Sequence, residues 1–246
     1  MRYGILSDIH ANLEALDAVL ARLEADGVSA YLCLGDVVGY GADPNACCER
    51  IRALPGLRCV AGNHDQAVLD QNLAEWFHEG ARVAAEWTAH QLTPQNRAFL
   101  AGLPETLCEP GFEMVHGSLA DPVCGYVLTP FAAADSFELQ REPLCLVGHV
   151  HAPLAFARRH ASRLVAHLEF RTGQPVRLSP GTQYLVGCGS VGQPRDGNPM
   201  AACAVYDSDA GVVECVRVPY DVETAGAKIR RAGLPPWLAD RLATGR

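Results

Sequence analysis

The chain has 246 residues, of which 49% are apolar and 20% are charged, and its formal net charge is -8. That length and apolar content suffice for a large buried core, and no Lys- or Arg-rich run is present to neutralise a nucleic-acid backbone. We therefore expect no stable nucleic-acid complex. No apolar run of about 18 residues predicts a membrane span and the first residues do not form a signal peptide, so we expect a cytoplasmic protein.

The first 60 residues alternate between strand and helix patterns. The predicted elements are a strand at 3–6, a helix at 11–25, a strand at 29–34, a helix at 44–54 and a strand at 58–60. This order is typical of a largely parallel sheet with crossover helices. Asp8, Asp36 and Asn63 each follow one of these strands, at the carboxyl ends where such sheets bind ligands.

The segment from about 74 to 102 has a helical pattern, and we expect an inserted pair of helices there. Pro94 should break the pattern or begin the second helix. Trp76, Phe77 and Trp87 are interpreted as core positions of these helices rather than as a stacking platform. The other predicted core positions are Val83 and Leu92.

A run of short strands follows the helical segment. They are predicted at 113–116, 144–147, 154–158, 164–168, 176–178, 184–186, 202–207 and 212–218. Such a run predicts a second, mostly antiparallel sheet. Two mixed sheets packed face to face with helices outside make a four-layer α/β/β/α sandwich. Because no linker is visible, we expect one domain over residues 1–246.

Ten cysteines are scattered through apolar stretches without any Cys-X-X-Cys pair. This number could suggest a disulfide framework, but cysteines within apolar runs favour buried thiols. We therefore expect reduced, mostly buried thiols that pack as small hydrophobes.

Short clusters of Asp, Asn and His recur along the chain. They are Asp8-Ile9-His10, Gly35-Asp36, Gly62-Asn63-His64-Asp65, His116-Gly117 and Gly148-His149-Val150-His151. The wide spacing favours an enzyme site over a structural zinc site. Oxygen and imidazole donors without thiolate suit Mn, Fe, Zn, Co or Ni. Two such ions about 3.5–4 Å apart can activate a hydroxide and hold both oxygens of a displacement at phosphorus.

These motifs, in this order, resemble those of the calcineurin-like metallophosphoesterase superfamily. The stretches 7–12, 35–41 and 189–197 further resemble its branch of small prokaryotic phosphodiesterases. The resemblance implies two divalent ions, with manganese as the first candidate, and a small phosphorylated substrate. It assigns one ion to Asp8, His10, Asp36 and His151, and the other to Asp36, Asn63, His116 and His149, so that Asp36 bridges them.

His64 follows a ligand but resembles the non-ligand histidine of the family. The resemblance implies that it donates to the scissile phosphate or protonates the departing oxygen, and we expect Asp65 to orient its ring. One departure concerns Gly187-Cys188-Gly189-Ser190, where many relatives have Asn-Pro-Gly-Ser. This change should leave the metal ligands intact. It alters the shape of the loop beside them, and we expect that shape to affect which substrate binds.

Four further residues are candidates for substrate contact. Arg195 lies among turn formers that leave its side chain free for a phosphate, although pairing with Asp196 or with solvent explains it equally well. Asn12, Ser118 and Tyr40 follow motif residues. Capping or packing explains each of these three as well as pocket lining does.

Two other motif interpretations fail, and three histidines remain outside any motif. Residues 187–192 match Gly-X-Gly-X-X-Gly, but no helix pattern follows to hold a pyrophosphate. His78-Glu79 begins a zinc-protease motif, yet position 82 is Arg where the second His is required. His90, His160 and His167 have no partner residues nearby in the sequence and are interpreted as surface or packing residues.

The sequence thus predicts a phosphodiesterase or a hydrolase of nucleotide phosphoanhydrides that uses a metal-bridging hydroxide. A phosphomonoesterase and a dinucleoside polyphosphate hydrolase are alternatives within the same chemistry. A metal-binding regulator with weak turnover is an alternative of another class, but the complete ligand set with His64 argues against it. The oligomeric state is left open.

Overall fold

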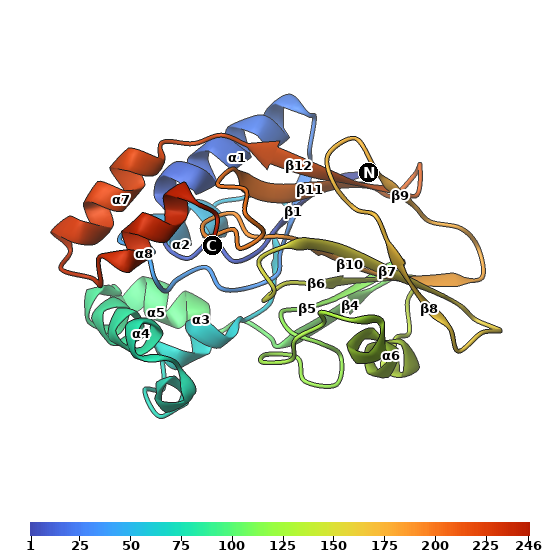
Figure 1. Ribbon diagram of the computed structural model, residues 1–246, viewed down its shortest axis with the longest axis horizontal. Helices are drawn as coiled ribbons and strands as arrows, with labels where there is room; N and C mark the ends of the chain where they lie inside the picture. Colours follow the sequence, from blue (N-terminus) through green and yellow to red (C-terminus); the bar gives the residue numbers. More distant parts are fainter.

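Two six-stranded β-sheets form the centre of the structure, a computed structural model that describes residues 1–246 (Figure 1). One buried apolar cluster lies between the sheets and includes Ile5 and Leu32 from the first sheet and Met114 and Leu146 from the second. A second cluster lies under the helices that cover the outer face of the first sheet. The predicted sandwich of two mixed sheets with helices outside is therefore confirmed.

The first sheet has the strand order β3-β2-β1-β11-β12-β9. Its strands are β1 (Arg2–Leu6), β2 (Ala30–Cys33), β3 (Arg58–Cys59), β9 (Val176–Arg177), β11 (Ala201–Asp207) and β12 (Val212–Val218). β1, β2 and β3 run parallel as predicted. The assignment of all the later strands to the second sheet is wrong, because β11 pairs antiparallel with β1 and draws β12 and β9 into the first sheet. Apolar alternation marks the faces of a strand but does not identify its neighbours.

The second sheet has the order β4-β5-β6-β10-β7-β8. Its strands are β4 (Thr106–Glu109), β5 (Phe112–Val115), β6 (Leu144–Val147), β7 (Pro153–Arg159), β8 (Val165–Leu168) and β10 (Thr182–Cys188). β6 runs parallel to both β5 and β10, while the other neighbours are antiparallel. This sheet is therefore mixed too.

Eight α-helices surround the sheets. They are α1 (Leu13–Ala25), α2 (Pro44–Arg52), α3 (Asn63–Ala67), α4 (Glu79–Gln91), α5 (Pro94–Ala101), α6 (Pro130–Leu139), α7 (Val222–Arg231) and α8 (Trp237–Asp240). Short 3₁₀ helices at Leu73–Trp76 and Arg241–Ala243 precede α4 and follow α8. None of the helices combines the length and the apolar character that a membrane-spanning segment requires.

The predicted helical pair appears as α4 and α5, and Pro94 is the first residue of α5. The predicted burial of Trp76 is wrong, because its side chain is 91% exposed. Trp76 is the last residue of the 3₁₀ helix that precedes α4. The α-helical spacing that suggested a core position therefore does not apply to it. Phe77 and Trp87 are partly buried and pack against apolar clusters.

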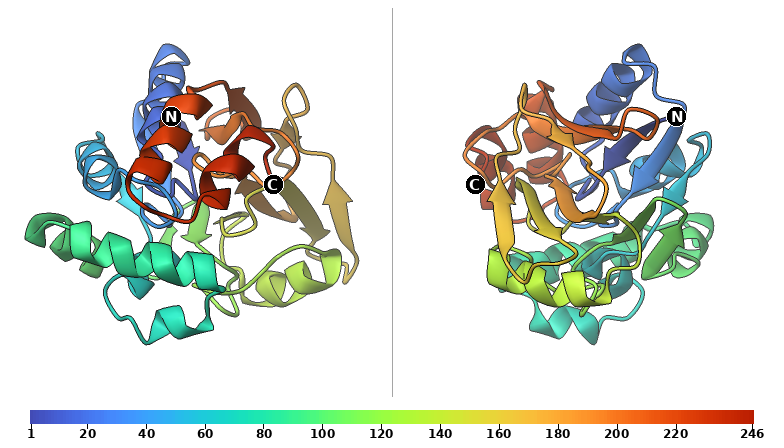
Figure 2. Two further views of the ribbon diagram at one scale, coloured as in Figure 1. Left: turned by 60° about the vertical axis from the view of Figure 1, so that its left-hand side comes forward. Right: turned by 90° about the vertical axis from the view of Figure 1, so that its right-hand side faces the viewer.

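The carboxyl-terminal helices lie beside α4. Figure 2 shows α7 and α8 in red next to the teal α4, and apolar side chains from these three helices form one buried cluster with Tyr40. The aromatic ring of Trp237 occupies the space next to Gly80, where a Cβ atom would lie 2.3 Å from the ring. This packing brings the last residues of the chain close to the carboxyl ends of the strands, where the motif clusters lie.

Candidate metal centre

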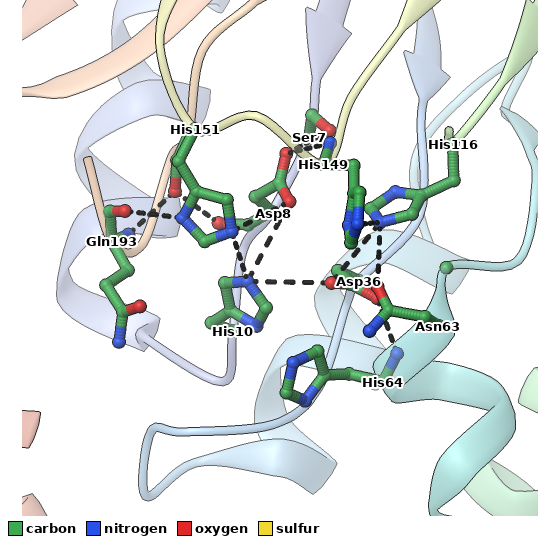
Figure 3. Close-up of polar contacts among 12 residues, drawn as sticks. Ser7, Asp8, His10, Asp36, Asn63, His64, His116, His149, His151 and Gln193 are labelled. Atoms are coloured by element: carbon green, nitrogen blue, oxygen red, sulfur yellow. Dashed lines mark hydrogen bonds and ion pairs between the residues drawn. The ribbon is translucent and has the colours of Figure 1, made fainter. Parts of the chain in front are cut away.

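The predicted metal ligands converge at one end of the two sheets (Figure 3). Every one of these side chains is buried. Their donor atoms form groups within 4.8 Å of one another, and the groups are Asp8 with His10 and His151, His10 with Asp36 and His64, and Asp36 with His116 and His149. Asn63 joins the last group, since its Oδ1 lies 3.1 Å from His116 Nε2. The structure therefore brings together all seven residues that the sequence singled out.

The backbone turns sharply where the strands end. Asp8, His10, Asp36, His149 and His151 all have positive φ angles, between 51° and 66°. The left-handed region costs a non-glycine residue about 1–2 kcal/mol, and such residues cluster at functional sites. Because of these turns, the paired residues of the Asp-X-His and His-X-His motifs point their side chains into the same space.

Main-chain carbonyl groups fix the tautomers of three histidines. A carbonyl oxygen only accepts hydrogen bonds, so the Nδ1 atom facing it carries a proton, and in the neutral ring Nε2 keeps a free lone pair. The pairs are His10 with Val38 (3.1 Å), His116 with Leu34 (2.7 Å) and His151 with Gln193 (2.6 Å). All three rings are thus held with a metal-binding nitrogen directed into the cluster.

The cluster fits divalent cations. The Nε2 atoms of His10 and His151 are 3.1 Å apart, and in the tautomers that the carbonyl groups select both present a lone pair. Donor atoms about 3 Å apart are neighbours around a cation whose bonds measure about 2.1 Å. The buried Asp8 Oδ1 and Asp36 Oδ2 have only imidazole nitrogens beside them, His151 Nε2 at 3.1 Å and His116 Nε2 at 3.4 Å, and a cation would neutralise the charge of both carboxylates.

Asp36 occupies the position between the two sets of ligands. Its Oδ2 lies 3.6 Å from His10 Nε2 and 3.4 Å from His116 Nε2. Its Oδ1 accepts a hydrogen bond from the main-chain N–H of His64 at 2.8 Å. One oxygen therefore fixes the carboxylate, and the other is free to face both halves of the cluster.

The charges within the cluster shift its pKa values strongly. Burial raises the pKa of Asp36, but His116 and the other imidazoles outweigh it and hold that pKa well below its usual range. Burial lowers the pKa of His116, while Asp36 more than reverses this and brings it to about 10. A cation in the cluster would compete with that proton for Nε2 of His116.

His64 stands at the edge of the cluster and differs from the ligands. Its ring lies 4.5 Å from those of Tyr40 and Phe77, and its Nδ1 is buried without a hydrogen-bond partner. Burial lowers the pKa of His64 to about 4, so the ring is neutral at pH 7 and one of its nitrogens can donate a hydrogen bond. Gly39 makes room for this ring, because a Cβ atom there would lie 2.6 Å from Nδ1.

Asp65 contacts main-chain atoms and does not form the predicted hydrogen bond with the His64 ring. Its Oδ1 accepts from the N–H of Val38 at 3.1 Å, and its Oδ2 accepts from the N–H of Gly62 at 3.0 Å. Both oxygens are thus occupied by neighbouring loops. Asp65 therefore positions the turn that carries Asn63 and His64.

A pocket of about 170 Å³ opens beside the cluster. Of the candidate substrate residues, Tyr40 and Arg195 line it. Asn12 instead caps α1 by accepting from Ala15 N at 3.1 Å, and the Ser118 hydroxyl accepts from Asp121 N at 3.0 Å. The pocket walls are Asp36, Tyr40, Asn63, His64, Trp76, Phe77, His78, Ala81, Tyr126, His149, His151 and Arg195. Asn12 and Ser118 are absent from these walls and have structural roles.

Sequence reasoning missed the aromatic character of this pocket. The Tyr126 ring lies 3.9 Å from that of His149, and Trp76 and Phe77 reach the pocket from the end of the 3₁₀ helix before α4. Tyr126 belongs to no motif. Trp76 and Phe77 are apolar residues next to a helical segment, so their spacing suggested a core rather than a binding surface.

The chain is similar to several known proteins. Residues 1–211 match the sequence profile of the calcineurin-like phosphoesterase superfamily domain. An uncharacterised protein of Methanocaldococcus jannaschii is 39% identical over 99% of this chain and 98% of its own. The crystal structure of a metallophosphoesterase from Sphaerobacter thermophilus has a TM-score of 0.88 and 38% identity, covering 100% of this chain and 99% of that one. A hypothetical protein from Pyrococcus horikoshii shares the fold, with a TM-score of 0.82 and 21% identity over 100% of this chain and 98% of its own.

Proposed function

This chain belongs to the calcineurin-like phosphoesterase superfamily, and we propose that it hydrolyses a phosphodiester or a nucleotide phosphoanhydride with two divalent cations. One observation carries the proposal. Buried oxygen and imidazole donors form three overlapping groups, two of which contain Asp36, and they open onto a pocket with aromatic walls. Manganese is the first candidate for the resident metal, since these donors suit borderline cations.

Each half of the cluster would hold one cation, with Asp36 Oδ2 common to both. Asp8, His10 and His151 complete the first set, and Asn63, His116 and His149 complete the second. When bound, the two cations supply Lewis acidity, which lowers the pKa of water and neutralises charge that develops on the phosphoryl oxygens. The carbonyl groups that hold the imidazole rings keep the donors in position throughout.

His64 would donate a hydrogen bond to the phosphoryl group or to the departing oxygen. Its ring borders the pocket, and one nitrogen has no partner within the protein. Asp65 would act on His64 through the backbone of the turn it fixes. His64 is thus the catalytic residue of this proposal, and Asp65 is a positioning residue.

The pocket walls favour a substrate with organic groups on both sides of phosphorus. Tyr126 lies over His149, whereas Phe77 lies against His64, so rings border the two halves of the cluster. A phosphodiester has two organic substituents that can pack against these rings, whereas a monoester has one. Arg195 adds a positive charge to the same pocket, which favours the nucleotide phosphoanhydride as the second form of the substrate.

Turnover of two aryl esters tests the proposal. Bis(p-nitrophenyl) phosphate and p-nitrophenyl phosphate are assayed with the manganese-loaded protein, after chelation and after manganese is restored. We expect a higher kcat/KM for the diester, loss of activity with chelation and recovery with the metal. Preference for the monoester would indicate a phosphomonoesterase. Bound metal without turnover of either ester would indicate a regulator.

A further inference from the structure

Two arginines from distant parts of the chain meet at one amide oxygen. Nη2 of Arg195 donates to Gln193 Oε1 at 2.9 Å, and Nη1 of Arg241 donates to the same atom at 3.0 Å. Gln193 is only 2% exposed, so its side chain is a fixed anchor. The two guanidinium groups are therefore held side by side.

Neither guanidinium has an acidic side chain for a partner. No Asp or Glu carboxylate lies within 4.0 Å of either one, although the chain has 28 acidic and 20 basic residues. Arg195 Nε is buried without a hydrogen-bond partner. Arg241 Nε donates to the main-chain oxygen of Arg246. Because a guanidinium has five N–H groups, several donors of this pair remain free.

The position of the pair is fixed by apolar packing. The Arg195 guanidinium lies 5.7 Å from the centre of the Tyr40 ring, and that of Arg241 lies 5.4 Å from the Trp237 ring. Burial lowers the pKa of Arg241, and the adjacent charge of Arg195 lowers it further. Two like charges held together in this way repel each other, and an anion between them would relieve the repulsion.

The pair is coupled to the metal centre through Gln193. The main-chain oxygen of Gln193 accepts the Nδ1 proton of His151 at 2.6 Å, while its side chain anchors both arginines. The N–H of Arg195 also donates to the main-chain oxygen of His151 at 3.0 Å, and the Arg195 side chain lines the pocket. An anion bound by the pair would therefore lie beside the pocket that opens onto the cluster.

We propose that Arg195 and Arg241 form a subsite for a second anionic group of the substrate, of the phosphate or phosphonate class. The inference rests on the proposed function and deepens it. The substrate would carry two phosphorus-centred anions, one at the metal centre and one at the arginine pair. Guanidinium groups suit this task because their fixed N–H geometry matches phosphate oxygens.

Calorimetric titration of the manganese-loaded protein tests the subsite without relying on turnover. The probes are methylphosphonate, which has one anionic group, and methylenediphosphonate, which has two and is not hydrolysed. The variants are Arg195→Gln and Arg241→Gln. Arg22→Gln is the matched control, since Arg22 lies on α1 and pairs with Asp26. Chelation of free metal by the diphosphonate is the same in every titration and cancels between variants.

We expect wild type and Arg22→Gln to bind the diphosphonate more tightly than the monophosphonate. Each of the two arginine variants should lose about tenfold or more of that preference, because charge-assisted hydrogen bonds are removed, and Arg241→Lys should recover part of it. A general structural defect would weaken both probes equally and lower the metal content. The inference is overturned if wild type shows no preference for the diphosphonate, or if both variants keep it. Hydrolysis of the aryl diester by wild type would then still support the proposed function.

Discussion

The Nε2 atoms of His10 and His151 face each other at 3.1 Å, and both rings have already committed their Nδ1 proton to a main-chain carbonyl. Two lone pairs at this distance repel, whereas a cation between them turns the contact into two bonds. Metal binding should therefore contribute to the stability of the fold as well as to its chemistry.

Removal of the metal should lower the thermal stability of the protein. Chelation leaves Asp8 and Asp36 as buried carboxylates without a cation, and a ligand present at 100 times its dissociation constant contributes about 2.7 kcal/mol. For a chain of this size we expect a fall of about 5–10 °C in the unfolding midpoint. Scanning calorimetry before chelation, after it and after manganese is restored measures the effect. An unchanged midpoint would contradict the proposed metal centre.

Asp36→Asn should weaken the binding of both metals together. Asn cannot supply the negative charge that Asp36 Oδ2 presents to His10 and His116. Elemental analysis of the dialysed variant should find well under two metal ions per chain. Asp17→Asn, which removes a surface partner of Arg50, is the control and should keep both ions. Two tightly bound ions in Asp36→Asn would disprove the bridging role.

His64→Ala should keep its metals and lose turnover. The ring borders the pocket but stands outside the proposed ligand set, so its removal should cut kcat by about 10² or more. His90→Ala, an exposed histidine on α4, should leave kcat unchanged. Metal content and aryl diester turnover are measured on the same samples. Loss of both ions from His64→Ala would show that His64 is a ligand.

Gly39→Ala should imitate His64→Ala without removing the ring. The new Cβ would lie 2.6 Å from His64 Nδ1 and must displace it. Gly111→Ala is a close control, because Gly111 has a φ of +97° against +96° for Gly39 but has open space around it. Both variants should lose about 1–2 kcal/mol of stability from backbone strain. Only Gly39→Ala should lose turnover of the diester, and equal turnover in the two variants would refute the packing argument.

Trp76→Ala should raise the KM for substrates with planar groups. Trp76 is 91% exposed yet lines the pocket, so its loss should cost little stability and about tenfold in KM for the aryl diester. Phe131→Ala is the control, since Phe131 is 86% exposed and lies on α6. Steady-state kinetics and thermal unfolding of both variants measure the two effects. An unchanged KM would remove Trp76 from substrate binding.

The strand ends of the first 60 residues could be predicted because apolar runs and polar motifs alternate there with little ambiguity. β1, β2, β3 and the two helices between them lie within a few residues of their predicted bounds. The pairing of β11 with β1 could not be predicted, because it joins residues about 200 positions apart. It also depends on which of the two sheets offers an unpaired edge strand to β11. α6 was also missed, since its first turn, Pro130-Phe131-Ala132-Ala133, has no polar face.

The candidate ligands could be found in the sequence because each lies next to a Gly or within two residues of another motif residue. Tyr126, Trp237 and Arg241 could not, since they reach the pocket region from loops and helices whose position depends on tertiary packing. Asp65 shows a different limit of sequence reasoning. An Asp next to a His suggests a side-chain pair, yet the turn directs the Asp65 oxygens to the N–H groups of Val38 and Gly62.

The two ends of the chain lie in different surroundings (Figure 1). The amino group of Met1 contacts Asp209 at 2.7 Å, at the start of β1 and far along the sheet from the motif clusters. Arg246 instead contacts Arg241, one of the two arginines anchored on Gln193. An affinity tag fused after Arg246 would therefore place a flexible peptide beside the arginine pair, and acidic residues in it would compete with anionic ligands. Recombinant protein intended for binding measurements should carry its tag at the amino end.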